Sequence, residues 1–110
     1  MSITFVAAEG GRECGMAGGW LRREGNSQCA VLSGMWVEPA QRRRGLALRL
    51  VQAVVRWARS RSAQHIELWV TEGNGPAWSL YLSAGFRAAC QFQQLRFDSS
   101  RQEELMTKPL

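Results

Sequence analysis

Three segments near the start of the chain have the hydrophobic pattern and composition of β-strands: residues 3–8, 14–22 and 29–37. Short stretches rich in glycine and polar residues separate them, at residues 9–12 and 24–27, and such stretches favour tight turns between paired strands. The pattern therefore predicts a three-stranded antiparallel meander. Pro39 ends it, because proline has no backbone N–H to donate to a further sheet hydrogen bond.

The next segment, residues 45–61, has the period of a helix whose polar side chains fall on one narrow arc. Those side chains are Arg49, Gln52, Arg56 and Arg59. The rest of the circumference is mainly apolar, so we expect most of this helix to be buried. Residues 65–70 then alternate like a strand, and a strand, a crossover helix and a further strand form a right-handed parallel unit.

The sequence after this unit predicts a second helix and a further strand. Residues 73–76 start the helix, and Gly85 ends it near a left-handed C-cap. A strand over residues 90–97 follows. The alternation of apolar and polar positions along this strand is interrupted between Phe92 and Leu95, which indicates a bulge or a local twist.

The end of the chain has two interpretations. Residues 98–100 predict a turn, after which residues 104–110 form either a last strand or a frayed tail. The predicted order is therefore three strands, helix, strand, helix, strand and an optional last strand, which is an α/β (α+β) class with a mixed sheet. With 110 residues and 45% hydrophobic content, we expect residues 1–110 to form a single domain.

Residues 37–47 place a proline, an arginine triplet and a glycine directly before the first predicted helix. The first N–H groups of a helix have no intrahelical partner and carry the positive end of the helix dipole, so they bind a phosphate that can approach them. Gly45 allows that approach, since it has no Cβ. The segment predicts an anion site, with a solvated basic loop as the alternative interpretation.

Two motifs carry a family resemblance. They are Arg42-x-x-Gly45-x-Ala47, preceded by Val37-x-Pro39, and Asn74-x-x-Ala77-x-x-x-Tyr81-x-x-x-Gly85-Phe86. The first is similar to the acetyl-CoA motif of the GNAT superfamily of N-acetyltransferases, and the second is similar to the segment that follows that family's fifth strand. The resemblance covers roughly residues 3–110. It implies a GNAT-like mixed sheet that is short at its N-terminal end, without the family's opening strand and two helices.

The resemblance also implies a site for acetyl-CoA. In the family, the pantetheine arm of the cofactor lies between two parallel strands that separate, here residues 35–37 and 69–71, with an ordinary parallel pair as the alternative. The pyrophosphate would contact residues 42–47, mainly through main-chain N–H groups. The implied cofactor contacts are Met35, Trp36, Val37, Arg42, Arg43, Arg44, Gly45, Leu46, Ala47, Asn74, Ala77 and Tyr81.

Tyr81 resembles the family tyrosine that protonates the departing coenzyme A thiolate. A tyrosine that packs its ring on the sheet is the alternative, and Asn74 fits a helix cap as well as a cofactor contact. The amine acceptor needs a general base, and Glu38 and Glu72 lie near the carboxyl ends of the two parallel strands. Both also fit exposed carboxylates of ordinary pKa. His65 lies at the other end of its strand and is a poor candidate.

Composition narrows the class of protein. The chain has no apolar run long enough for a membrane span and no signal-peptide pattern, which predicts a soluble cytoplasmic protein. Cys14, Cys29 and Cys90 show neither C-x-x-C spacing nor a histidine cluster, so we expect buried small side chains and no metal site. The net charge of +5 suits coenzyme A or nucleic acid, but the aromatic residues do not interleave with the arginines as a base-stacking surface requires.

Three functions therefore stay open. Acetyl transfer from acetyl-CoA to an amine of a small molecule or a protein accounts for both motifs. A non-catalytic acyl-CoA-binding or interaction module would suit the missing opening helices, and a small basic nucleic-acid-binding domain suits the charge but lacks a recognition motif.

Five tryptophans in 110 residues are more than a domain this small readily buries, so we expect a homodimer, with a tightly curled monomer as the alternative.

Overall fold

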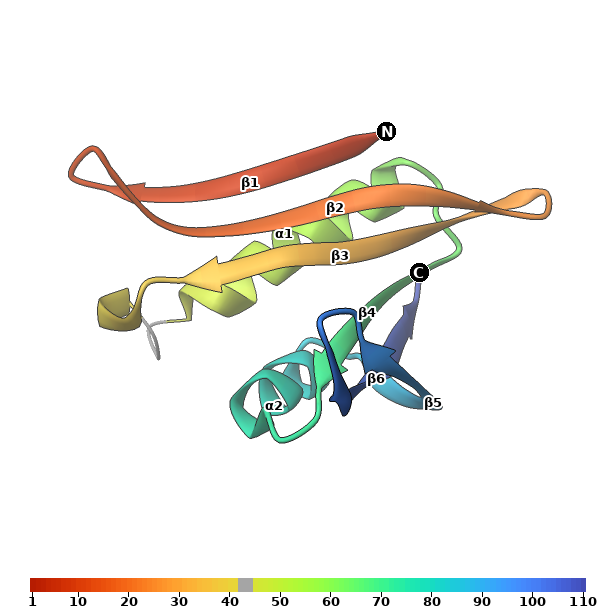
Figure 1. Ribbon diagram of the computed structural model, residues 1–110. Coiled ribbons are helices and arrows are strands. Elements are labelled where there is room, and N and C mark those ends of the chain that lie inside the picture. The colour runs from red at the N-terminus through yellow and green to blue at the C-terminus, as the bar shows by residue number, and fades with distance from the viewer. Residues whose placement is uncertain (42–44) are drawn as a thin grey trace.

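The computed structural model describes residues 1–41 and 45–110, and within these ranges the chain forms one six-stranded sheet with two α-helices and a short 3₁₀ helix. The elements are β1 (Ser2–Glu9), β2 (Arg12–Glu24), β3 (Ser27–Val37), the 3₁₀ helix η1 (Pro39–Gln41), α1 (Leu46–Ser60), β4 (His65–Thr71), α2 (Gly75–Ser83), β5 (Arg87–Leu95) and β6 (Asp98–Pro109). The strands lie in the order β1-β2-β3-β4-β6-β5 (Figure 1). Strands β3 and β4 are parallel and the other described pairs are antiparallel. The predicted α/β class with a mixed sheet is confirmed.

The predicted meander is confirmed as β1, β2 and β3. Side chains alternate between the two faces of a strand, and β2 has glycines on the face that meets α1. A Cβ at Gly19 would lie 2.9 Å from Val54 Cγ1 and 3.0 Å from Trp57 Cζ3. One at Gly15 would lie 3.1 Å from Leu50 Cδ1. These glycines therefore allow α1 to pack directly on the backbone of β2.

Helix α1 lies across one face of β1, β2 and β3 and forms the main core with the sheet (Figure 1). Its buried side chains are Leu50, Val51, Val54, Val55, Trp57 and Ala58. Ile66, Leu68 and Val70 of β4 belong to the same core. The mostly buried helix predicted from the sequence is thus present. None of the helices in residues 1–41 and 45–110 is long and apolar enough to cross a membrane.

Helix α2 begins and ends at residues that the sequence indicated. Asn74 is its N-cap, and the side-chain oxygen of Asn74 accepts a hydrogen bond from the Ala77 N–H at 3.2 Å. Gly85 follows the helix with a φ of 97°, which is the left-handed conformation expected there. The chain then turns inward, so that Phe86 is fully buried against the core.

The C-terminal hairpin differs from the sequence prediction. Its turn lies at Arg96 and Phe97, not at residues 98–100, because Asp98 already belongs to β6. The carboxylate of Asp98 accepts hydrogen bonds from Ser100, and this local contact gives the sequence the character of a turn. Strand β6 inserts between β4 and β5, so the chain end is a paired strand and not a frayed tail.

Strand β5 is irregular over a longer stretch than the sequence indicated. A register shift between Gln94 and Leu95 lies within the segment from Phe92 to Leu95, where the sequence predicted a bulge or a twist. A larger shift lies between Ala88 and Phe92, and Cys90 between them has a φ of 56°. The pairing of β5 with β6 is therefore interrupted near the middle of the strand.

The three cysteines are free thiols in two different environments. Cys14 and Cys29 are buried, as expected for small apolar side chains. Cys90 is exposed in the irregular part of β5, which is an edge strand of the sheet. The expectation of burial is therefore wrong for Cys90.

Candidate active site

Strands β3 and β4 pair only over their first residues. The parallel register joins residues 29–31 to residues 65–67, and among the described residues it extends no further. Beyond this point β3 continues to pair with β2, and β4 continues to pair with β6. The two strands diverge toward their carboxyl ends (Figure 1). This is the separation that the family resemblance implies, and not an ordinary parallel pair.

A cavity of about 750 Å³ lies between the end of β3, the start of α1 and one side of α2. Its lining residues are Met35, Trp36, Val37, Gly45, Ala47, Leu48, Asn74, Pro76, Ala77, Ser79, Leu80, Tyr81 and Ser83. Eight of the twelve implied cofactor contacts are among them. Of the others, Leu46 is half-buried against the core and does not line the cavity. Arg42, Arg43 and Arg44 lie outside the described residues.

The start of α1 forms one wall of this cavity. Gly45 precedes the helix with a φ of 77° and a ψ of 1°, and a Cβ at this position would meet no described atom within 4 Å. The backbone is therefore open to an approaching ligand. Because the first N–H groups of α1 have no intrahelical partner and lie at the positive end of the helix dipole, this wall suits an anionic group.

Tyr81 is the one titratable side chain among the described residues that line this cavity. It lies on α2, is only 7% exposed, and packs edge-on against Phe86 with ring centroids 5.9 Å apart and an interplanar angle of 66°. Burial raises the pKa of the Tyr81 hydroxyl above its ordinary value. The hydroxyl is therefore protonated at neutral pH and held by a fixed ring, as a proton donor must be.

The two predicted general bases lie outside the cavity that Tyr81 lines. Glu38 pairs with Arg12 at 2.8 Å, and its Oε2 atom is buried with no hydrogen-bond partner among the described residues. Glu72 Oε1 accepts a hydrogen bond from the Gln102 N–H at 3.2 Å. Each carboxylate is thus held by a neighbour at the edge of the site. The structure does not bring either of them to Tyr81.

Glu72 instead lines a neighbouring cavity of about 440 Å³. Asn74 and Ser79 line both cavities, so the two adjoin. Glu103 and Glu104 line the neighbouring cavity as well. Sequence reasoning missed these two, because they meet Glu72 only through the register of β6 on β4, which the sequence does not reveal. The second cavity therefore carries three carboxylates beside the first.

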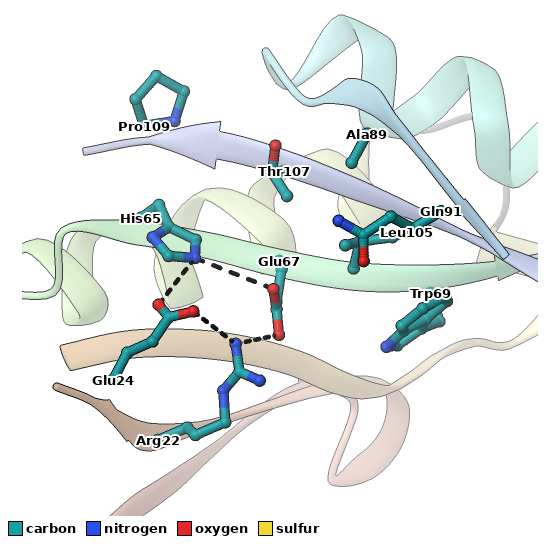
Figure 2. Close-up of a pocket in the computed structure, with 10 residues that line it drawn as sticks. All are labelled: Arg22, Glu24, His65, Glu67, Trp69, Ala89, Gln91, Leu105, Thr107 and Pro109. Atoms are coloured by element: carbon teal, nitrogen blue, oxygen red, sulfur yellow. Dashed lines mark ion pairs between the residues drawn. The ribbon is translucent and has the colours of Figure 1, made fainter. Parts of the chain in front are cut away.

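A third cavity, of about 500 Å³, lies along one face of β4, from His65 to Trp69 (Figure 2). Its polar side chains form a chain of contacts: Arg22 Nη2 is 2.7 Å from Glu67 Oε1, and His65 Nε2 is 3.5 Å from Glu24 Oε2. Glu67 is only 8% exposed and is the one buried charged side chain among the described residues. His65 is the first residue of β4, away from the separated strand ends, as the sequence indicated.

Known proteins resemble this chain in sequence and in fold. The family profile described as Acetyltransferase (GNAT) family matches residues 2–86. Aminoglycoside N(6')-acetyltransferase type 1 of Klebsiella aerogenes is 34% identical over 67 residues, which make up 61% of this chain and 44% of that protein. The matched segment thus spans less than half the length of this relative.

Two solved structures agree with the whole described fold. The crystal structure of nourseothricin acetyltransferase superposes with a TM-score of 0.84 at 27% identity, and covers 98% of this chain and 65% of that one. Ribosomal-protein-alanine N-acetyltransferase from Brucella melitensis gives a TM-score of 0.82 at 25% identity, with 97% and 68% covered. The chain therefore spans about two thirds of the length of each of these structures.

Proposed function

Because this chain belongs to the acetyltransferase (GNAT) family, we propose that it transfers the acetyl group of acetyl-CoA to an amine of a small molecule or a protein. The observation that carries this proposal is the cavity between the end of β3, the start of α1 and one side of α2, past the last pair that joins β3 to β4. Its walls combine an open helix N-terminus at Gly45 with a buried, protonated Tyr81. The helix N-terminus suits the phosphates of an acyl carrier, and the tyrosine can protonate the departing thiolate.

Each wall has a part in the proposed reaction. The pyrophosphate of acetyl-CoA binds at the start of α1, where unpaired N–H groups meet it. The pantetheine arm lies along β3 at Met35, Trp36 and Val37, past the last pair that joins β3 to β4. The acceptor nitrogen attacks the thioester carbonyl, and Tyr81 donates its proton to the sulfur as the tetrahedral intermediate collapses and the C–S bond breaks. The nitrogen then gives up its extra proton to solvent, and the Tyr81 phenolate takes a proton back from solvent.

We place the acceptor in the neighbouring cavity. Glu72, Glu103 and Glu104 supply negative charge there, and negative charge raises the local concentration of a cationic amine. The amine must lose a proton before it attacks. Glu72 is the better placed of the two predicted bases because it lines this neighbouring cavity, whereas Glu38 does not and is paired with Arg12. The names of the relatives point to aminoglycosides, nourseothricin and ribosomal-protein alanine, and these supply the amines to test.

A non-catalytic acyl-CoA-binding or interaction module is the second candidate. It is favoured by one observation, namely that neither Glu38 nor Glu72 lines the cavity of Tyr81. Such a module would keep the cofactor site and lack turnover. The nucleic-acid-binding alternative has only the positive charge of the chain in its favour. The single-domain organisation of residues 1–110 and the cytoplasmic location stay predictions.

Calorimetry and an acetylation assay separate these functions. We expect acetyl-CoA to bind the protein with one site per chain, and a duplex oligonucleotide to show no binding at physiological salt. Chromatographic detection of the acetylated product on a panel of an aminoglycoside, nourseothricin and an alanine-starting peptide then tests turnover. Binding without any product would favour the non-catalytic module, whereas tight duplex binding without cofactor binding would contradict the family function.

We also propose that a second copy of the chain covers the sheet face that α1 leaves open. Val6 and Trp36 lie on either side of Met16 in the register of β1, β2 and β3, and Trp20 lies further along β2. All four are at least 38% exposed. Because the alternate β2 residues contact α1, these side chains point to the opposite face. A row of exposed apolar groups across three strands is the kind of surface that a twofold interface buries.

Light scattering tests this dimer. We expect a mass of twice 12.3 kDa at micromolar concentration, and a return to 12.3 kDa in the Met16→Glu variant, which places a charge at the centre of the row. Leu82→Glu is the matched control, because Leu82 on α2 is as exposed as Met16, at 38%, and lies outside the row. A wild-type mass of 12.3 kDa without concentration dependence would contradict the dimer.

A further inference from the structure

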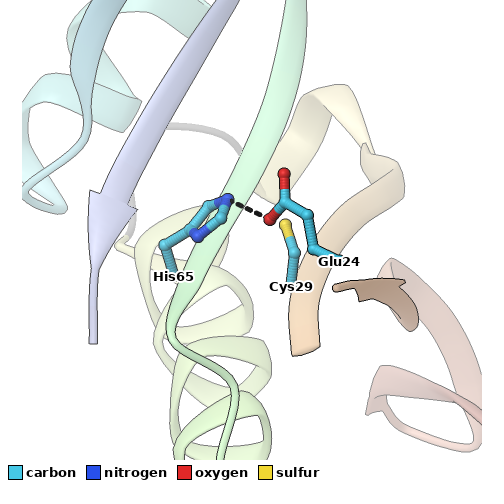
Figure 3. Close-up of side chains that lie close together, drawn as sticks. All are labelled: Glu24, Cys29 and His65. Atoms are coloured by element: carbon cyan, nitrogen blue, oxygen red, sulfur yellow. Dashed lines mark ion pairs between the residues drawn. The ribbon is translucent and has the colours of Figure 1, made fainter. Parts of the chain in front are cut away.

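Three potential metal ligands from different strands converge at the end of the sheet opposite the candidate active site (Figure 3). Cys29 of β3 is the meeting point, because the register sets it beside His65 on β4. Glu24 ends β2, at the hairpin that leads into β3, and its carboxylate reaches toward the same point. The sequence spacing did not indicate this cluster, since it depends on the parallel pairing of β3 and β4.

The distances within the cluster fit one small cation. The ligand atoms of Glu24, Cys29 and His65 all lie within 4.8 Å of one another, and His65 Nε2 is 3.5 Å from Glu24 Oε2. Bond lengths of about 2.0 to 2.3 Å in a tetrahedral zinc site put neighbouring ligand atoms roughly 3.3 to 3.6 Å apart. A pair of ligand atoms at the 4.8 Å limit therefore has to close by roughly 1.2 to 1.5 Å around a zinc ion of that geometry.

The neighbouring Arg22 does not block the site. Its strong contact is the ion pair with Glu67, at 2.7 Å. Its contact with Cys29 Sγ, at 3.5 Å, is an ordinary hydrogen bond to sulfur, and its contact with Glu24 Oε1, at 3.7 Å, is long for an ion pair. Arg22 is partly exposed, so when an ion takes its place at Cys29 its guanidinium keeps Glu67 and water as partners. A divalent ion and Arg22 carry three positive charges, which the carboxylates of Glu24 and Glu67 and the thiolate of Cys29 balance. The cluster is therefore electrically neutral when a divalent ion is bound.

We propose that Glu24, Cys29 and His65 bind one zinc ion. A thiolate, an imidazole and a carboxylate together select zinc over the hard cations calcium and magnesium. Binding releases the thiol proton of Cys29 to solvent, and the fourth position of the ion is left for water. The ion links β2, β3 and β4 at the short stretch where β3 and β4 pair, residues 29–31 with residues 65–67. Its effect is to stabilise the fold, independently of the proposed acetyl transfer.

Cobalt(II) reports directly on this site, because a thiolate bound to it gives a near-ultraviolet charge-transfer band. Tag-free protein, treated with a chelator and dialysed, should develop the band on titration with Co²⁺, saturate at one ion per chain, and lose the band when Zn²⁺ is added. Glu24→Gln should weaken Co²⁺ binding by at least roughly 10- to 100-fold, since loss of even an outer-shell partner costs that much. Glu24 is half exposed, so this variant should fold normally.

Cysteine variants identify the thiolate. Cys29→Ser should abolish the charge-transfer band, and Cys90→Ser is the matched control that should keep it, because Cys90 is exposed and lies on β5. Zn²⁺ should also raise the thermal midpoint of the wild type, and should raise that of Glu24→Gln less at the same concentration. The proposal is overturned if the wild type gives no thiolate band, if the band survives in Cys29→Ser, or if Glu24→Gln binds Co²⁺ as tightly as the wild type.

Discussion

Replacing Gly45 with aspartate should lower the affinity for acetyl-CoA roughly 100-fold or more, whereas asparagine at the same position should leave it within about tenfold. The two side chains have nearly the same size, and both tolerate the left-handed conformation that Gly45 adopts, with a φ of 77°. They differ in one negative charge at the start of α1. A unit charge about 5 Å from a phosphate, at the effective dielectric constant of a protein surface, costs about 3 kcal/mol, which is roughly a hundredfold in affinity.

The stability of the two variants serves as a control for this experiment. A negative charge at a helix N-terminus is favourable by about 0.3–1 kcal/mol, so Gly45→Asp should unfold at a temperature no lower than Gly45→Asn. Space is available in both, because a Cβ at Gly45 would meet no described atom within 4 Å. Calorimetric titration with acetyl-CoA measures the affinities. Equal affinity in the aspartate and asparagine variants would place the pyrophosphate away from the start of α1.

Local sequence signals predicted most of the fold. The alternation in residues 65–70 identified β4, and Gly85 marked the end of α2 because a helix commonly ends at a residue that can adopt positive φ. The error lay at residues 98–100, where Asp98 and Ser100 form a local hydrogen bond that favours a turn in a sequence. Pairing with β4 and β5 on both sides overrides that preference and makes the segment the start of β6.

The walls of the candidate site were predicted better than the charges around it. Gly45 and Tyr81 lie in short motifs whose spacing is local, and the structure places both on one cavity. Glu103 and Glu104 lie in no motif, and their position beside Glu72 depends on β6 lying between β4 and β5. Strand order is a property of the whole chain, so no local pattern could reveal it.

The polar cluster at the other end of the sheet was beyond sequence reasoning for the same reason. Cys29 and His65 are 36 residues apart, and the parallel register alone makes them neighbours. An expectation of no metal site followed from the absence of closely spaced ligands. Such spacing identifies sites built within one loop or hairpin, whereas a site built across parallel strands leaves no mark of this kind in the sequence.

Removing the hydroxyl of Tyr81 should reduce turnover roughly 10- to 1000-fold with little change in the affinity for acetyl-CoA. A general acid typically contributes about 10²- to 10⁴-fold, so the expected loss covers the lower part of that range. Tyr81→Phe keeps the ring, so the buried edge-on contact with Phe86 should persist and the protein should stay folded. Burial raises the pKa of this hydroxyl, so the wild-type donor stays protonated as pH rises through neutrality. Turnover is measured on the acceptor that the panel identifies, and cofactor affinity by calorimetry.

A second hydroxyl in the same cavity provides the matched control. Ser83 also lines the cavity, but its Oγ donates a hydrogen bond to the Leu80 carbonyl within α2, so Ser83→Ala should leave turnover close to that of the wild type. If the reaction needs the Tyr81 proton, the Phe variant alone should be slow, and its defect should appear in kcat and not in cofactor binding. Equal turnover in Tyr81→Phe and the wild type would instead assign the tyrosine to packing, and would require the departing thiolate to take its proton from water.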